Sequence, residues 1–223
     1  MGYPPGTIII ACGDLSRYTK FSRSLSQLAI PEGTLTLWSE GVSVAANLNR
    51  ALEKRVGEWV WFLGDDHTFA PDLLYRLLNH GLDAVVPLVL KRKPPCEPVI
   101  YKAIQANGWV EYFRWDEIPA SGVFPIAAAG AAGLLVRARV LEKLDPPYFA
   151  VGQVTKDQLS EDLWFCRRLQ EAGIPLYVDL DTMMGHITPI VLSPVRIEDG
   201  RWAVDVDFDN GTHIQFPIEV PPR

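Results

Sequence analysis

The sequence predicts an α/β protein with a mostly parallel central sheet flanked by helices and a small β-hairpin appendage at the C-terminal end. Apolar runs at Thr7–Cys12 and 59–63 are typical of buried strands, and segments with helical spacing follow them. After Pro194 the chain alternates polar and apolar residues between Asp-Gly and Asn-Gly turns, as antiparallel hairpins do. We therefore expect a core domain over residues 1–190 and a hairpin tail over 191–223 packed on that core.

The N-terminal half predicts strands that alternate with helices, which implies a parallel, helix-covered sheet. The expected strands are 7–12, 34–38, 59–63 and 84–86, and the expected helices are about 17–29, 43–55 and 73–80. Pro71 is expected at the first position of the third helix, where its missing N–H costs nothing.

The second half predicts a hairpin, two further helices and then short strands. The expected hairpin joins 99–104 to 109–114 through Asn107-Gly108, followed by a strand at 133–136, helices at 138–144 and 160–172, strands at 175–178 and 182–186, and tail strands at 195–198, 201–208 and 212–218.

Composition excludes several classes of protein. The 223 residues suit one α/β domain with a short appendage, and the net charge of −6 argues against a nucleic-acid partner. Three cysteines without a CxxC pattern favour a reducing compartment, so we expect a cytoplasmic protein. No signal peptide is evident, and the longest small-apolar stretch, 124–136, is too short to span a bilayer.

Gly64-Asp65-Asp66-His67 is the most informative stretch, because it directly follows the buried strand at 59–63. Open α/β sheets bind ligands at the carboxyl ends of their strands. Adjacent carboxylates there suit a hard divalent cation that also touches phosphate oxygens. The alternative is a helix-entry turn with solvated acids.

Two further elements add to this cluster. Glu161 and Asp162 open a helix capped by Ser160, where the helix dipole favours ionised carboxylates and one of them could act as a general base. His186 follows Gly185, which permits a close backbone approach, and its imidazole could complete the coordination of Mn²⁺ or a similar ion. Taken singly, acids at a helix start are more often ordinary helix charge, and a histidine at a strand end is more often a structural or surface residue.

Lys91-Arg92-Lys93 is the most basic cluster of the chain. It is compatible with a solvated loop or with attraction of an anionic ligand to the sheet edge.

In combination, these elements resemble a GT-A fold glycosyltransferase of the broad family-2 type. The resemblance runs from about Thr7 to Thr188. It rests on the strand-borne Gly64-Asp65-Asp66-His67 motif, on the segments 130–137 and 161–169, and on the string 171–179 that is followed by Gly185-His186.

The resemblance implies a nucleotide-sugar donor, with UDP favoured over GDP, held through its diphosphate by Mn²⁺ or Mg²⁺. It implies Asp66 and His186 as metal ligands and Asp65 as a contact of the ribose or the donor sugar. It implies Asp162 as the catalytic carboxylate, with Glu161 supporting it or touching the acceptor. The acceptor, whether a glycan, a small molecule or a protein, and the linkage stereochemistry stay open.

The same resemblance implies contacts to the nucleotide and to the sugar. The implied nucleotide contacts are Ala11, Cys12, Gly13, Asp14 and Asn47, and the implied glycines beside the sugar are Gly130 and Gly133. The sequence departs from the family pattern at one position. The first acid of the family's DxD motif would fall at position 64, where this sequence has Gly64. Either Asp65 takes the role of that acid, or His67 contributes to the site.

Two other functions compete. A sugar-phosphate nucleotidyltransferase should carry a Gly-rich basic loop after the first strand, and the loop beginning at Gly13 has few such residues. A catalytically inactive nucleotide- or glycan-binding protein on the same scaffold would explain Gly64. The tail is compatible with acceptor binding, with covering the donor site, or with the contact of a homo-oligomer.

Overall fold

A computed structural model describes residues 2–12, 18–41, 43–151, 159–199, 201–208 and 212–217. The helices are α1 (Thr19–Gln27), α2 (Val44–Leu52), α3 (Leu73–Asn79), α4 (Ala138–Leu141) and α5 (Glu161–Glu171), with a 3-10 turn at Trp115–Glu117. The strands are β1 (Thr7–Cys12), β2 (Leu35–Glu40), β3 (Trp59–Gly64), β4 (His67–Thr68), β5 (Ala84–Leu88), β6 (Ile100–Ile104), β7 (Val110–Tyr112), β8 (Val123–Ile126), β9 (Ala128–Ala129), β10 (Leu135–Arg137), β11 (Leu176–Met183), β12 (Gly185–His186), β13 (Val191–Arg196), β14 (Trp202–Asp207) and β15 (His213–Pro217).

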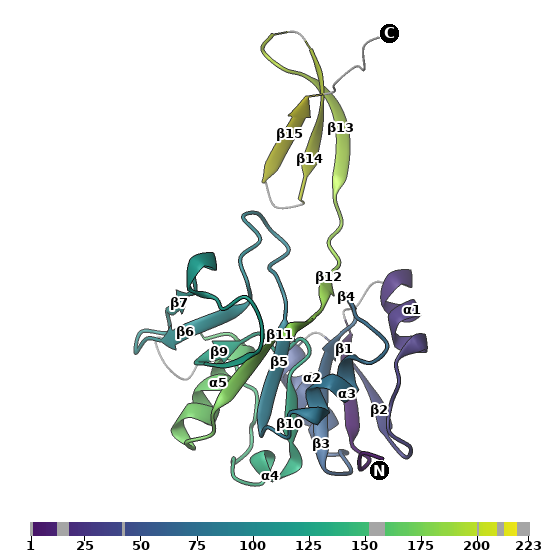
Figure 1. Ribbon diagram of the computed structural model, residues 1–223, viewed down its shortest axis with the longest axis vertical. Helices are drawn as coiled ribbons and strands as arrows, with labels where there is room; N and C mark the ends of the chain where they lie inside the picture. The colour runs from purple at the N-terminus through teal and green to yellow at the C-terminus, as the bar shows by residue number, and fades with distance from the viewer. Residues whose placement is uncertain are drawn as a thin grey trace.

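A seven-stranded sheet in the order β2-β1-β3-β10-β5-β11-β8 forms the centre of the molecule (Figure 1). Strands β2, β1, β3, β5 and β11 run in one direction, and β10 and β8 run against them. The predicted mostly parallel sheet is therefore confirmed. Because β2 and β3 lie on opposite sides of β1, the strand order reverses at β1, which is where such sheets form a ligand crevice.

Two apolar cores lie on the two faces of this sheet, since successive strand residues point to opposite sides. Ile9 packs in the core that contains the buried residues of α2 and α5. Ile8 and Ile10 pack in the other core, with Phe21 of α1 and the leucines of α3. The helices therefore cover both faces of the sheet, as predicted. Among the described residues, no helix is both long and apolar enough to cross a membrane.

The structure differs from the predicted elements in several places, of which three concern the arrangement of the sheet and its helices. Helix α3 begins at Leu73 rather than at Pro71, because the Pro71 carbonyl accepts the N–H of Ala29 and so lies outside the helix. The two strands expected between 175 and 186 are the long strand β11, which carries an irregularity, and the short strand β12. Strand β10 inserts between β3 and β5, so these two parallel strands are not neighbours.

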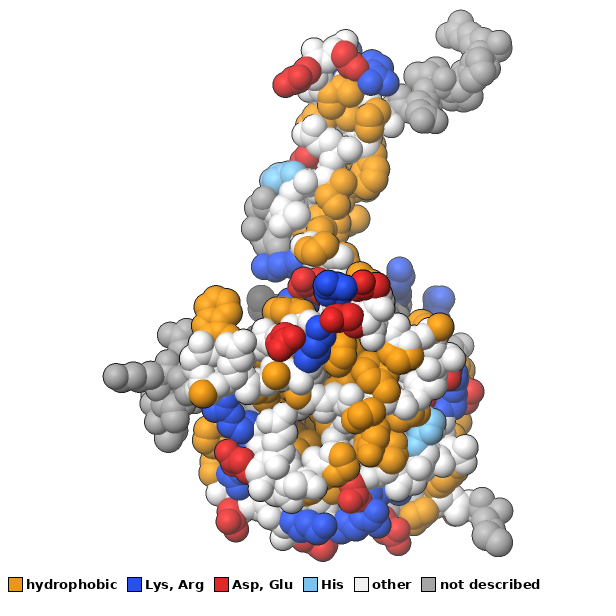
Figure 2. Space-filling model, turned by 60° about the vertical axis from the view of Figure 1, so that its left-hand side comes forward, with side chains coloured by type: hydrophobic (Ala, Val, Ile, Leu, Met, Phe, Trp, Pro, Cys, Tyr) orange, Lys and Arg blue, Asp and Glu red, His pale blue; other side chains and the backbone are white. Residues whose placement is uncertain are grey.

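The predicted C-terminal appendage is a three-stranded antiparallel sheet, β13-β14-β15. We expected this tail to pack on the core, but it projects from the α/β body (Figure 1). Cross-strand pairing places an apolar set on one face: Leu192, Pro194, Trp202, Val204, Val206, Ile214 and Phe216. Leu192, Trp202 and Phe216 are exposed, and hydrophobic side chains run along the tail in Figure 2.

Candidate functional site

A cavity with a volume of about 740 Å³ opens at the carboxyl ends of β1 and β3. It is lined by Ala11, Cys12, Tyr18, Gly41, Val44, Leu48, Phe62, Leu63, Gly64, Asp65, Asp66, His67, Arg92, Ala131, Ala132, Glu161, Asp162 and His186. The volume falls in the range of small-molecule and cofactor sites. The acidic turn, the start of α5 and His186 thus share one cavity, as the sequence predicted.

The acidic turn is fixed by a two-stranded ribbon. Asp65 and Asp66 form the turn between β3 and β4, and β4 pairs with β12 so that His67 lies opposite His186. A Cβ atom on Gly185 would overlap Thr68 Oγ1, so glycine is required where the two strands meet. The close approach that Gly185 was expected to permit is therefore the approach of β12 to β4.

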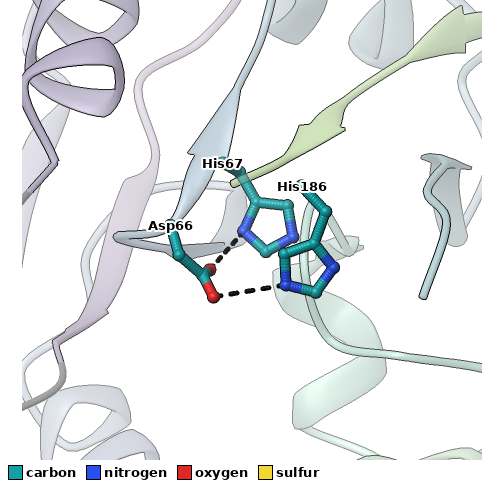
Figure 3. Close-up of side chains that lie close together, drawn as sticks. All are labelled: Asp66, His67 and His186. Atoms are coloured by element: carbon teal, nitrogen blue, oxygen red, sulfur yellow. Dashed lines mark hydrogen bonds and ion pairs between the residues drawn. The ribbon is translucent and has the colours of Figure 1, made fainter. Parts of the chain in front are cut away.

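Asp66, His67 and His186 bring their side-chain ligand atoms within 4.8 Å of one another (Figure 3). His67 Nδ1 lies 2.7 Å from Asp66 Oδ1, and His186 Nε2 lies 3.2 Å from Asp66 Oδ2. The two imidazole rings stack with their centroids 4.3 Å apart. Residues from two chain segments thus converge on one point beside the cavity.

The hydrogen bonds of the two histidines fit a cation better than a purely structural cluster. His186 Nδ1 donates to the Leu90 carbonyl oxygen at 2.9 Å, so Nε2 can donate to Asp66 only when both ring nitrogens carry a proton, and in the neutral imidazole it presents a lone pair toward Asp66. Both ring nitrogens of buried His67 lack a hydrogen-bond partner, because the short approach to Asp66 is poorly aligned. Lone pairs that face a carboxylate repel it unless a proton or a metal ion lies between them, and imidazole with carboxylate suits Mn²⁺ and similar ions.

Asp66 is held in its ionised form. Burial alone would raise its pKa, but the hydrogen bond with His186 and the proximity of His67 outweigh burial and hold the pKa well below the usual range. The carboxylate is therefore negatively charged at neutral pH, as a cation ligand must be.

Gly64 has a steric explanation. A Cβ atom built at this position would lie 2.9 Å from both Asp66 Oδ1 and His67 Nδ1. Any side chain at position 64 would therefore displace two members of the cluster. The Asp66 and His67 side chains occupy the space that an acidic side chain at position 64 would need.

We expect His67→Ala to weaken Mn²⁺ binding by at least about tenfold, because it removes one of three converging ligand groups. Calorimetric titration of the purified protein with Mn²⁺ measures the effect. The matched control is His80→Ala, since His80 pairs with Asp179 at 2.8 Å but lies outside the cavity. Equal Mn²⁺ affinity in the two variants would exclude His67 as a ligand.

Helix α5 carries Glu161 and Asp162 into the cavity. Ser160 caps the helix by accepting the N–H of Leu163. Phe165 anchors it in the core, where its ring stacks on Phe149 at 4.8 Å. The first turn is therefore fixed in position beside the loop at Ala131, whose N–H is bonded to Asp162.

Burial raises the pKa of Asp162 to about 7, the negative charge of Glu161 adds to this effect, and the Ala131 N–H opposes it. The sequence predicted that the helix dipole would favour the ionised form, but burial and the neighbouring acid prevail. A carboxyl group that titrates near neutral pH can accept a proton in one step and release it in the next, which suits a general base.

The other predicted contacts divide into four groups. Ala11 and Cys12 line the cavity, whereas Gly13 and Asp14 lie outside the described residues. Gly130 lines a second cavity of about 120 Å³, where an added Cβ would lie 3.7 Å from Asp162 Oδ2.

Asn47 and Gly133 do not line either cavity. Asn47 is buried and donates to the Gly41 carbonyl at 2.9 Å, so it supports a cavity-lining loop from behind. At Gly133, with φ of +80°, a Cβ would lie 2.5 Å from Pro87. This glycine allows its loop to pack against the sheet strand that contains Pro87.

Tyr18 and Arg92 line the cavity but were not among the predicted site residues. The sequence marked Arg92 only as part of the basic cluster Lys91-Arg92-Lys93. It did not show which of these three residues reaches the cavity. The helical spacing of the predicted helix at about 17–29 included Tyr18 but did not mark it as a site residue; it reaches the cavity from the position just before α1.

Comparison with known proteins supports the GT-A-like fold that the sequence predicted. Residues 25–125 match the family model described as Glycosyl transferase family 2. The crystal structure of A197 from STIV is similar, with a TM-score of 0.52, 14% sequence identity and coverage of 97% of each chain. The chain has a GT-A-like fold.

A second solved structure, the crystal structure of GalNAc-T7 with UDP, GalNAc and Mn²⁺, matches with a TM-score of 0.55 and 10% identity. The match covers 82% of this chain and 44% of the GalNAc-T7 chain, so this chain spans less than half of that structure. No curated protein sequence matches this GT-A chain significantly.

Proposed function

We propose that this protein transfers a sugar from a nucleoside-diphosphate sugar, with UDP favoured over GDP, to an acceptor hydroxyl. The observation that carries the proposal is the single cavity that holds both the Asp66–His67–His186 cluster and the Asp162 carboxyl. A GT-A fold and a family 2 sequence match give independent support.

The residues of the cluster would hold Mn²⁺ or Mg²⁺, and we favour Mn²⁺ because two of the three ligand groups are imidazoles. When bound, a divalent cation supplies positive charge for the diphosphate that leaves the donor. Asp65 also lines the cavity and is proposed to contact the ribose or the donor sugar.

Asp162 is the proposed general base. It accepts the proton of the acceptor hydroxyl while the acceptor oxygen bonds to the anomeric carbon. The bond from that carbon to the diphosphate breaks, and its electron pair leaves with the diphosphate oxygen. Burial, together with the negative charge of Glu161, keeps the pKa of Asp162 high, so that the carboxylate is a stronger base than a solvated aspartate.

The experiment that tests this function is calorimetric binding of UDP, GDP, CDP and ADP, each with and without Mn²⁺. We expect UDP to bind tightly only when Mn²⁺ is present, and Asp66→Asn to remove this metal dependence. If GDP binds tightly instead of UDP, the donor is a GDP-sugar and the proposed mechanism is unchanged.

Absence of metal-dependent binding for all four nucleotides would contradict the proposal. The acidic turn would then be structural, and an inactive binding protein on the same fold would be the better description. Turnover of a donor in the presence of Mn²⁺ separates an enzyme from such a binding protein.

A further inference from the structure

Arg92 differs from its two basic neighbours. Lys91 pairs with Glu97 at 2.8 Å and lies 4.0 Å from the centre of the Tyr112 ring, so its charge is engaged away from the site. Lys93 is exposed and does not line the cavity. Arg92 is the only lysine or arginine among the described residues that line it.

The cavity needs positive charge if it is to bind a diphosphate. Four carboxyl groups line it, those of Asp65, Asp66, Glu161 and Asp162. A diphosphate that enters such a site meets like charge in a partly buried environment, where repulsion is weakly screened. A cation at the histidine cluster would offset part of this repulsion, and the guanidinium of Arg92 is the remaining positive group among the described residues that line the cavity.

In the structure without ligands, Arg92 is paired with the cation site itself. Its Nη1 lies 3.4 Å from Asp66 Oδ2, the same oxygen that faces His186 Nε2 at 3.2 Å. The Arg92 side chain is about half exposed, at 49%, and a long, solvated ion pair of this kind is weak. A cation bound through Asp66 would compete with Arg92 for this oxygen.

We propose that Arg92 binds the diphosphate of the donor and changes partner, from Asp66 to a phosphate oxygen, when a divalent cation occupies the cluster. This inference rests on the proposed function, because it assigns a residue to the diphosphate of that same donor. Without metal the guanidinium neutralises Asp66, and with metal it becomes available to the anion. The planar fork of arginine matches two phosphate oxygens, which a lysine ammonium does not.

Arg92 would also stabilise the leaving group. After the anomeric carbon–oxygen bond breaks, the terminal phosphate of the departing diphosphate carries about one further negative charge at pH 7. A positive group that already contacts the diphosphate strengthens its interaction as this charge develops. Loss of Arg92 should therefore affect both donor affinity and turnover.

The test is calorimetric binding of UDP and of uridine in the presence of saturating Mn²⁺, at fixed ionic strength. We expect Arg92→Gln to weaken UDP binding by about tenfold or more and to leave uridine binding within about twofold. Arg92→Lys should restore only part of the affinity. Lys93→Gln is the matched control, because it removes the same charge from the adjacent position of the same loop and should change UDP affinity by less than about twofold.

A second titration, with Mn²⁺ alone, tests the exchange of partners. Arg92→Gln should bind Mn²⁺ at least as tightly as the unaltered protein, because the competitor for Asp66 is removed. A general structural role for Arg92 would instead weaken Mn²⁺ binding, and that result would overturn the inference.

The two proposals fail in different ways. If the unaltered protein binds UDP with Mn²⁺ and Arg92→Gln binds it equally well, the role of Arg92 is wrong and the proposed function stands. If the unaltered protein binds no diphosphate with Mn²⁺, the proposed function fails, and the assignment of Arg92 fails with it.

Discussion

Asp162→Asn is expected to lower sugar transfer by about 10²–10⁴-fold while Mn²⁺-dependent UDP binding stays within about twofold of the unaltered protein. The amide keeps the shape of the side chain but cannot accept a proton from the acceptor. Asp162 is not a member of the cation cluster, so the nucleotide should still bind. Steady-state transfer assays and UDP calorimetry on the same preparation measure the two quantities. Normal transfer by this variant would exclude Asp162 as the base.

The pH dependence of transfer provides an independent check on the same residue. Since the pKa of Asp162 is raised to about 7, the base is protonated and inactive below that pH. We expect kcat/KM to rise with pH through about 7 and then level off. Glu161→Gln removes the neighbouring charge that contributes to the raised pKa, so it should shift the midpoint to lower pH. An unchanged midpoint in that variant would mean that another group controls the profile.

Gly64→Asp is expected to abolish measurable Mn²⁺ binding, although it restores the acid that a DxD motif would place at this position. The new Cβ would lie 2.9 Å from Asp66 Oδ1 and from His67 Nδ1, a distance that real Cβ atoms do not show. One or both of these groups must therefore move out of the cluster. Mn²⁺ calorimetry measures the loss, with thermal unfolding followed by circular dichroism to verify that the variant is folded.

Two further variants separate steric from electrostatic causes. Gly64→Ala carries the same Cβ without a charge, so it should also weaken Mn²⁺ binding strongly. Gly130→Ala adds a Cβ near Asp162 and Val99, away from the cation cluster, and should leave Mn²⁺ affinity unchanged. Tighter Mn²⁺ binding by Gly64→Asp would show that the site accepts an acid at position 64 and would contradict the steric explanation.

Much of the fold could be predicted because its determinants are local. The buried runs of β1 and β3 and the capped start of α5 are encoded in adjacent residues, and the structure confirms all three elements. The insertion of β10 between β3 and β5 could not be predicted, because pairing between distant strands leaves no periodic signal in either one.

The candidate site likewise has a part that could be predicted from the sequence and a part that could not. Asp66 and His186 come together as expected, because each follows a strand that ends at the same edge of the fold. Asn47 was predicted from the resemblance to contact the nucleotide, but its amide donates to the Gly41 backbone instead. The direction of a side chain depends on neighbours that are remote in sequence, and the raised pKa of Asp162 likewise depends on burial that the helix-start pattern does not reveal.

The attachment of the projecting sheet has a mechanical consequence. The chain leaves His186 directly for the tail, and the N–H of Ile187 donates to the Asp66 carbonyl oxygen at 2.7 Å. The connection to the sheet therefore begins at Ile187, which is hydrogen-bonded to one member of the Asp66–His67–His186 cluster and covalently adjacent to another. A load applied to the tail, by a bound object or by a pulling force, acts first on the spacing between Asp66 and His186. We therefore expect tension on the C-terminal sheet to change the metal affinity of the proposed site more directly than any other property.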